Sequence, residues 1–304
     1  MQKEKTALTA WPLALVVVAI VGLAGCGGGG NKGAAAPASA ALTYTGLSSA
    51  ATITTTNAQA LSNGAVNGTT ATGAGAGGAL LGVQSVGGGA VGAPSMEQAM
   101  ENVVTQTVTA QTSGAMFVGA VTAGNTVIAG PCGGSVTANA TASGGGSTVS
   151  GTLNFNNYCD TDIVFVSGSI GFTALVNGQS IITSLSITTV ATAKLSVLAR
   201  RLGMVFKIET LDITANIQNG VVTLSTVTGS FYHPTYGYVT LSTASSLVIP
   251  SGSPYPMSGG LLLTDTLGNR ALITALDSNH YQLQIDADHN GTYESTANGL
   301  WSSL

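Results

Sequence analysis

The sequence predicts a mostly β protein, with a disordered tether followed by one N-terminal helix packed on a large curved antiparallel meander of about 10–12 strands. Three observations predict this fold class. From about Gly114 onwards, β-branched residues recur in short runs, many of which alternate between polar and apolar residues. These runs are separated by Gly, Asn, Pro and Ser, as expected for tight turns. Ahead of them, one stretch has apolar residues at the spacing of a helix. Such a meander has to curl or close, because large twisted sheets do not stay flat.

Residues 1–25 have the three zones of an export signal. Lys3 and Lys5 open the chain, and no charge occurs between residues 12 and 25. The aliphatic run of roughly 14 residues is shorter than the roughly 20 that a membrane-spanning helix needs. It ends in Leu23-Ala24-Gly25-Cys26, which resembles the lipobox of bacterial lipoproteins. The alternatives are an ordinary secretory signal with an unrelated cysteine, or a short anchor that is never cut.

The lipobox resemblance implies cleavage before Cys26, a thioether-linked diacylglycerol on its sulfur and a further acyl chain such as palmitate. Several acyl chains, at about 0.8 kcal/mol per buried CH₂, anchor a protein stably. Gly27 rather than Asp follows the cysteine, and by the same resemblance this favours the cell outer membrane. We therefore expect a protein of the bacterial cell envelope that meets the membrane through the lipid on Cys26.

Residues 26–93 are expected to form the lipidated cysteine and a Gly/Ala-rich low-complexity tether. Gly-rich chain is flexible, and the last part of this region is nearly all Gly, Ala, Val and Leu, without charge or sustained period. Within it, Tyr44-Thr45-Gly46 followed by Ile53 and Asn57-Ala58 resembles a segment of uncharacterised β-rich envelope lipoproteins. Thr56 or Asn57 is a candidate cap for a short helix at this point.

Residues 94–304 are expected to be the folded domain, which begins with a helix over about 95–112. Glu97 and Glu101 lie in its first turns, where the helix dipole favours acidic residues. Its apolar face is formed by residues at helical spacing, which are Met96, Met100, Val103, Val104 and Val108. We expect this face to pack on the sheet.

The clearest strand of the domain is 280–286, where Tyr281, Leu283 and Ile285 share one face. Leu195 to Ile208 is predicted as one long bent strand, with a short helix as the alternative. Hairpin turns are predicted at three dipeptides, Asn177-Gly178, Asn219-Gly220 and Gly268-Asn269.

Cys132 and Cys159 predict a disulfide bond, because two thiols in one domain pair readily in an oxidising envelope compartment. Closing a loop of about 27 residues stabilises by roughly 3.5 kcal/mol on the chain-entropy model. A metal or redox pair is the alternative. No histidine lies near either cysteine, however, and their spacing is not C-x-x-C.

The charge content excludes a nucleic-acid-binding protein. The sequence has 8 Lys and Arg against 12 Asp and Glu, and only 7% of its residues are charged. Gly, Ala, Ser and Thr dominate instead, so we expect a neutral surface that is rich in hydroxyl groups.

One local motif suggests a cofactor, which is Ca²⁺. Asp286-Ala-Asp288-His-Asn290-Gly291 matches the first half of an EF-hand loop, with oxygen ligands at positions 1, 3 and 5 and Gly at 6. The candidate ligands are Asp286, Asp288, Asn290 and Glu294. Position 12 is Ala297 instead of Glu, and strands instead of helices flank the loop. The alternative is a hairpin turn whose Asp and Asn side chains bond their own backbone.

No catalytic residue is predicted, and an enzyme is not expected. The sequence contains no nucleophile elbow, phosphate loop, zinc triad or close carboxylate pair, and Asp160 and Asp162 are explained by a solvated turn. His280 and His289 are expected to be solvated. His233 lies in an aromatic patch that either stacks on sugar rings or caps a sheet edge, formed by Phe231, Tyr232, Tyr236 and Tyr238.

Two functions compete. The first is a structural, adhesive or binding lipoprotein that presents its neutral β domain to polysaccharide or to other envelope proteins. The second is a carrier of a lipid or other hydrophobic ligand, since a leading helix and a curved meander resemble the half-barrel carrier folds of bacterial envelopes. A carrier needs an apolar cavity of several hundred Å³, whereas an adhesive domain fills its core with side chains.

Overall fold

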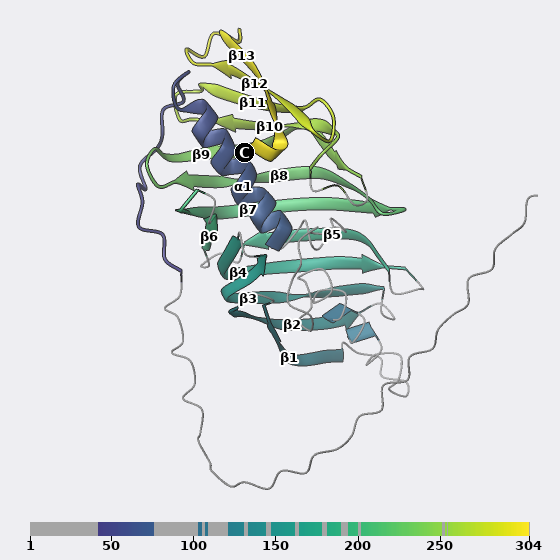
Figure 1. Cartoon of the computed structure of the whole chain (residues 1–304). Helices are drawn as coiled ribbons and strands as arrows, with labels where there is room; N and C mark the ends of the chain where they lie inside the picture. The colour runs from purple at the N-terminus through teal and green to yellow at the C-terminus, as the bar shows by residue number, and fades with distance from the viewer. Residues whose placement is uncertain are drawn as a thin grey trace, which may run out of the picture. The chain divides into compact units, whose positions relative to one another are not determined.

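The computed structural model describes residues 42–75, 103–104, 107–108, 121–130, 133–143, 147–161, 164–177, 181–189, 194–199, 202–250, 253 and 255–303. The described residues confirm the predicted fold class, because they form one large antiparallel sheet with α1 (Ala58–Gly75) packed on it (Figure 1). None of the helices among these residues is long and apolar enough to cross a membrane.

The sheet has 13 strands, slightly more than predicted. They are β1 (Val121–Ala129), β2 (Ser135–Ser143), β3 (Thr148–Thr161), β4 (Val164–Val176), β5 (Ile182–Thr189), β6 (Leu195–Ala199), β7 (Met204–Gln218), β8 (Val221–His233), β9 (Gly237–Ile249), β10 (Ser258–Thr264), β11 (Arg270–Ala275), β12 (His280–Asp286) and β13 (Ser295–Leu300), followed by the 3₁₀ helix η2 (Trp301–Ser303).

Neighbouring strands follow chain order across the sheet, with one exception. β5 and the short β6 both lie between β4 and β7, each pairing with a different part of these two longer strands. The predicted single bent strand from Leu195 to Ile208 is therefore a hairpin of β6 and β7, with Gly203 at φ 62° in the turn. The Asn219-Gly220 turn is found where predicted, with both residues at positive φ.

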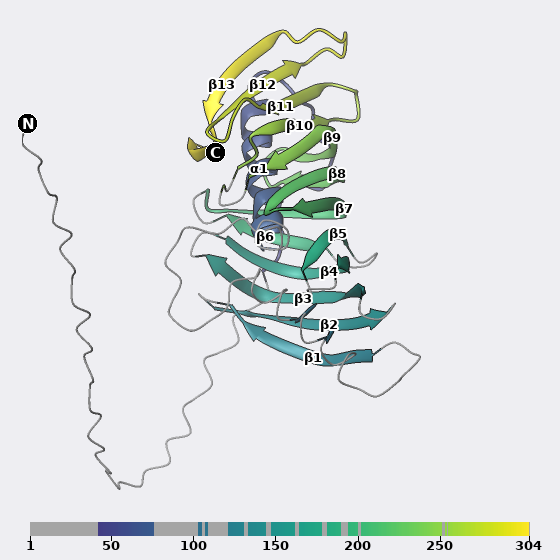
Figure 2. The same cartoon turned by 90° about the vertical axis from the view of Figure 1, so that its right-hand side faces the viewer.

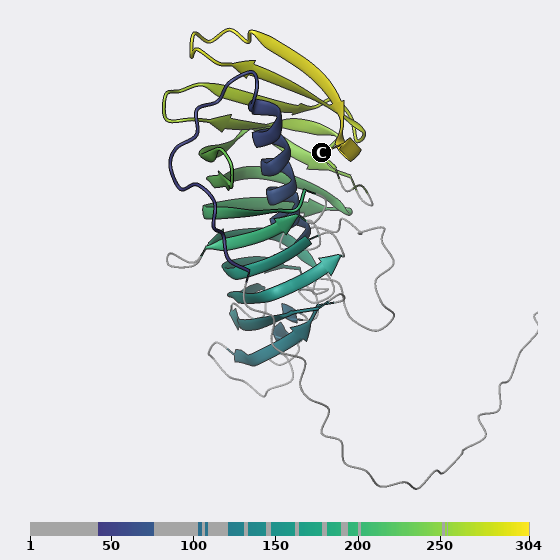
Figure 3. The same ribbon diagram turned by 60° about the vertical axis from the view of Figure 1, so that its left-hand side comes forward.

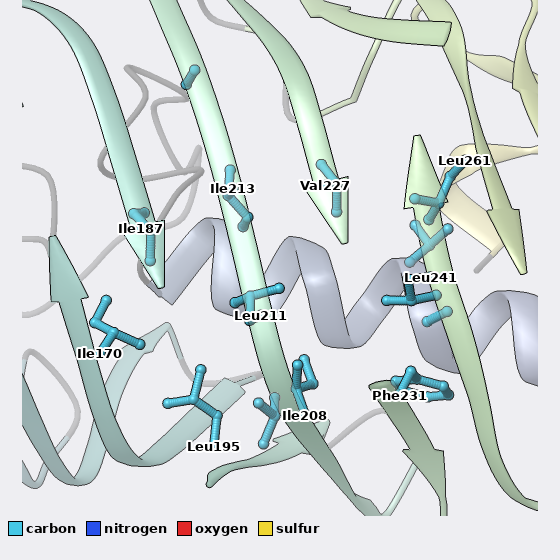
Figure 4. Packing of buried hydrophobic residues seen from close by; sticks show 14 of the residues in the cluster. Ile170, Ile187, Leu195, Ile208, Leu211, Ile213, Val227, Phe231, Leu241 and Leu261 are labelled. Atoms are coloured by element: carbon cyan, nitrogen blue, oxygen red, sulfur yellow. The ribbon is translucent and has the colours of Figure 1, made fainter. Parts of the chain in front are cut away.

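The core lies between α1 and the face of the sheet that it covers, called here the inner face (Figure 2). Ala58, Leu61 and Ala65 of α1 are fully buried. Aliphatic and aromatic side chains of the strands meet them, among them the residues labelled in Figure 4, which are Ile170, Ile187, Leu195, Ile208, Leu211, Ile213, Val227, Phe231, Leu241 and Leu261. Burial of this face supplies most of the hydrophobic stabilisation of the described fold.

The cap of α1 includes Asn57, one of the two predicted capping residues, together with Thr54. The Oγ1 of Thr54 accepts a hydrogen bond from the backbone N–H of Asn57, and the Oδ1 of Asn57 accepts one from the N–H of Thr54. This reciprocal pair is a capping box that satisfies two otherwise free donors at the helix start. Thr54 and Asn57 together, and not Thr56, begin the helix.

Part of the predicted tether, from Leu42 into α1, is packed chain in the structure, and the predicted boundary at residue 94 lies outside the described residues. Buried residues such as Ile53 and Leu61 hold this region on the sheet. Its residues are mostly small and uncharged, as those of a flexible tether are, so the sequence did not indicate that it packs. Most of the predicted helix 95–112 lies outside the described residues. Its four described residues, Val103, Val104, Thr107 and Val108, are helical, and the first three are buried.

Candidate functional site

Residues 42–57, called here the strap, cross the ends of several strands before they enter α1 (Figure 3). The N–H of Leu42 donates to the Oδ1 of Asn157 at 2.7 Å, and the N–H of Leu47 donates to the carbonyl of Pro234 at 3.0 Å. Ala50 then pairs with Tyr238 in a parallel bridge. The strap contacts the outer face at its start and continues into α1 on the inner face. Residues 42–75 therefore contact both faces of the sheet.

Under the start of the strap, five polar or aromatic side chains form a row across the outer face. Each is directly opposite the next in the strand register, and the row runs through Ser167 (β4), Ser196 (β6), Lys207 (β7), Tyr232 (β8) and Tyr238 (β9). The first three are buried, with 6%, 9% and 7% of their surface exposed. Buried polar groups need partners, and Ser167 has one in Asn157, whose N–H donates to its Oγ at 3.0 Å, while Lys207 has one in Glu209.

Lys207 is the charged centre of this row. Its Nζ lies 3.1 Å from the Oε1 of Glu209 and 3.6 Å from the centre of the Tyr232 ring, and the Tyr44 ring of the strap lies 5.3 Å away. The hydroxyl of Tyr44 shares its single proton between the carbonyl of Leu47 at 2.6 Å and that of His233 at 3.1 Å. A buried ammonium is stabilised by a carboxylate and by ring faces, so this cluster fixes the strap on the sheet.

Glu209 is held in its ionised form. Partial burial opposes ionisation, but the hydrogen bond from Tyr232 and the ammonium groups of Lys194 and Lys207 outweigh it and hold the pKa of Glu209 at about 2. Burial, with the hydrogen bond to Glu209, raises the pKa of Tyr232, and burial raises the pKa of Tyr44 to about 12. Glu209 is therefore ionised at neutral pH, where it pairs with the ammonium group of Lys207.

The low pKa of Glu209 predicts a pH dependence of stability. The unfolded chain binds this proton near pH 4.5 and the folded protein only near pH 2, so the contribution of Glu209 is complete above about pH 5 and is lost as the pH falls toward 2. We expect Glu209→Gln to cost about 1–2 kcal/mol at pH 7 and much less at pH 3. Urea unfolding at both pH values measures this difference. Asp212→Asn, an exposed change on the same strand, is the control and should not reproduce it.

The predicted aromatic patch does not form one platform for a sugar. Phe231 and His233 face the inner side, where His233 packs against Phe206 and Tyr236, and burial lowers the pKa of His233. Tyr232 and Tyr238 face the outer side, where the Tyr44 ring packs edge-on against Tyr232. The alternation of side chains along a strand separates residues that are adjacent in sequence.

A second feature of the outer face is a shallow depression of about 450 Å³ over β2 to β5. Gly171 of β4 lies directly between Thr152 of β3 and Thr188 of β5. The absence of a side chain at this position opens the depression. The remaining lining residues are Thr141, Ser150, Gly151, Phe172, Thr173 and Ser186, so none of the lining residues carries a charge.

The candidate calcium ligands lie together in the loop between β12 and β13. One carboxylate oxygen from each of Asp286, Asp288 and Glu294 lies within 4.8 Å of the others. Asp286 is 1% exposed, and its two oxygens accept hydrogen bonds from the backbone N–H groups of Asn290 and Gly291, both at 3.1 Å. These are the bonds expected of the alternative, a turn whose side chains bond their own backbone.

The other predicted residues are placed as follows. Cys159 is fully buried and disulfide-bonded, whereas Cys26, Cys132 and Asp162 lie outside the described residues. The N–H of Cys159 donates to the carbonyl of Gly133, so the chain next to residue 132 lies against Cys159, as the predicted pairing with Cys132 requires. Asp160 lies in β3 and His280 pairs with Asp277 on the surface.

Sequence reasoning missed both features of the outer face. Lys207 and Glu209 are two residues apart on a strand and so share a face, which was the available signal for their pairing. No comparable signal marks Gly171, because the depression depends on the register of three strands. Comparison with models of protein families, with curated proteins and with solved structures finds no match for this chain.

Proposed function

We propose that this protein is a lipoprotein of the bacterial cell envelope, anchored in the outer membrane through lipid on Cys26. In this proposal the β domain is not an enzyme, and it binds or supports other components of the envelope. The observation that carries the proposal is the lipobox at Leu23-Ala24-Gly25-Cys26, followed 16 positions after its cysteine by the first residue of the strap. In this proposal the strap is the part of the described fold that lies nearest in sequence to the lipid anchor.

A binding or structural role is favoured over the carrier role by the inner face. Side chains from α1 and the strands fill the region between them, and Gly64 of α1 approaches Phe231 and Phe206 closely. A hydrophobic ligand would have to displace α1 to reach this apolar surface. Native mass spectrometry of the mature protein tests the alternative, and a stoichiometric co-purified lipid other than the anchor would favour the carrier.

Anchoring is tested by Cys26→Ser. The wild-type protein is expected in the membrane fraction. The variant loses the acyl acceptor and is expected to be soluble after fractionation, with the same melting temperature, because the described fold begins at Leu42. A variant that remains in the membrane fraction, or a wild-type protein that is soluble, would contradict the proposal.

The same proposal includes a Ca²⁺ ion held by Asp286, Asp288, Asn290 and Glu294, supported by the sequence motif and by the clustering of the three carboxylates. For a site with a dissociation constant of about 1 mM, 10 mM Ca²⁺ stabilises by about 1.4 kcal/mol and raises the melting temperature by about 3 °C. Asp288→Ala, at an exposed ligand, should abolish this rise, and Mg²⁺ should not reproduce it. An unchanged melting temperature with Ca²⁺ would mean that the loop is a hairpin turn and does not bind Ca²⁺.

A further inference from the structure

We infer that the outer-face depression around Gly171 binds an uncharged glycan. This inference rests on the proposed binding role and specifies its ligand. The depression measures about 450 Å³, which is the size range of small-ligand sites. It lies in the middle of the sheet, where β3, β4 and β5 are already paired with each other, so a ligand meets side chains and not free backbone groups.

The chemistry of the lining selects the class of ligand. Two rows of side chains cross the strands in register, Thr141–Ser150–Thr173–Ser186 and Thr152–Gly171–Thr188. The hydroxyl of Thr141 donates to the carbonyl of Ser150. Within the described part of the chain, the other five hydroxyls, on Ser150, Thr152, Thr173, Ser186 and Thr188, have no hydrogen-bond partner in the protein and remain available.

Each free hydroxyl is both a donor and an acceptor, as is each hydroxyl of a sugar. A charged ligand would find no counter-charge among the lining residues, and an apolar ligand would desolvate the hydroxyls without replacing their hydrogen bonds. Extended peptides bind mainly through free strand edges, which this mid-sheet position lacks. An uncharged glycan needs no counter-charge, offers hydroxyls that replace the lost hydrogen bonds and needs no free strand edge, so it is the class of ligand that fits this site.

Gly171 provides a sharp test of this site. A Cβ at this position would lie 3.4 Å from the Oγ1 of Thr188 and at least 3.8 Å from any other atom, which is ordinary contact. Valine also suits a strand better than glycine. Gly171→Val should therefore fill the depression while the melting temperature stays equal or rises. Thr240→Val, on the exposed part of β9, is the control for loss of a surface hydroxyl outside the depression.

The probes are maltohexaose, cellohexaose and laminarihexaose, offered to the mature protein in a detergent without a sugar headgroup. Phosphatidylcholine vesicles with and without digalactosyldiacylglycerol form a second arm. We expect at least one neutral probe to bind with a dissociation constant on the order of 1 mM or tighter, and Gly171→Val to weaken it at least tenfold. Thr240→Val should leave it unchanged. Binding in the first arm identifies a free polysaccharide, and binding confined to glycolipid vesicles identifies a lipid headgroup.

Absence of binding to every neutral probe, binding that Gly171→Val leaves unchanged, or tighter binding of the anionic polygalacturonate would overturn this inference. None of these outcomes affects the lipid anchor. If Cys26→Ser is soluble and the wild-type protein is membrane-bound, failure of the glycan probes therefore rejects the glycan site alone. If the wild-type protein is not membrane-bound, the proposed function itself fails, whatever the probes bind.

Discussion

Replacing Asp265 with alanine is expected to lower the free energy of unfolding by about 3 kcal/mol. Asp265 is 7% exposed, in the turn between β10 and β11. Its Oδ2 accepts a hydrogen bond from the N–H of Ile53 in the strap at 2.7 Å, and its Oδ1 accepts from Leu267 and Asn269 at 2.8 and 3.0 Å. The alanine variant leaves these donors without the carboxylate and detaches the strap just before α1.

Asp277→Ala is the matched control for Asp265→Ala. Asp277 also accepts hydrogen bonds from two backbone N–H groups of its own turn, those of Asn279 and His280, but it is exposed and does not contact the strap. We expect it to cost less than about 1 kcal/mol. Urea denaturation of both variants measures the difference. Equal losses would mean that the strap contact adds nothing to stability.

Gly64→Leu is expected to destabilise the protein by about 3 kcal/mol. A Cβ at this position would lie 2.9 Å from the Cζ of Phe231, 3.0 Å from Phe206 and 3.2 Å from His233, so a larger side chain forces α1 away from the sheet. Gly64→Ala is the control with a smaller side chain. We expect it to destabilise the protein less than Gly64→Leu, because its gain in helix propensity, about 1 kcal/mol, offsets part of the crowding. Thermal melts compare the two variants. A leucine variant as stable as the alanine variant would contradict the close packing of α1 at Gly64.

Together, these two substitutions test the claim that residues 42–75 are part of the fold. Asp265 holds the strap through the N–H of Ile53, and Gly64 allows α1 to contact the sheet closely. If both variants are destabilised as expected, residues 42–75 contribute to the stability of the sheet and are not a tether.

The sheet was predictable because its signals are local. Strand 280–286 alternates, with Tyr281, Leu283 and Ile285 on the buried face, and β12 has these bounds. The turn at Asn219-Gly220 follows from the positive φ that these residues tolerate. Local pattern of this kind decides which residues form strands and which face of each strand is buried.

The strap was not predictable for the opposite reason. Ile53 and Asp265 are 212 positions apart, and no pattern in the sequence indicates that they form a hydrogen bond. The helix α1 is built mainly of Ala, Gly, Thr and Asn, a composition that also suits a tether, and only its contacts with the sheet distinguish the two. The carboxylates of the Asp286 loop were predictable as a cluster because they lie within one turn.

The proposed lipid on Cys26 is tested most directly by mass spectrometry of the N-terminal peptide from membrane-extracted protein. We expect a peptide that begins at Cys26 and carries the mass of a diacylglyceryl group, with or without a further acyl chain. A peptide that retains residues before Cys26, or one that begins elsewhere with an unmodified cysteine, would contradict it.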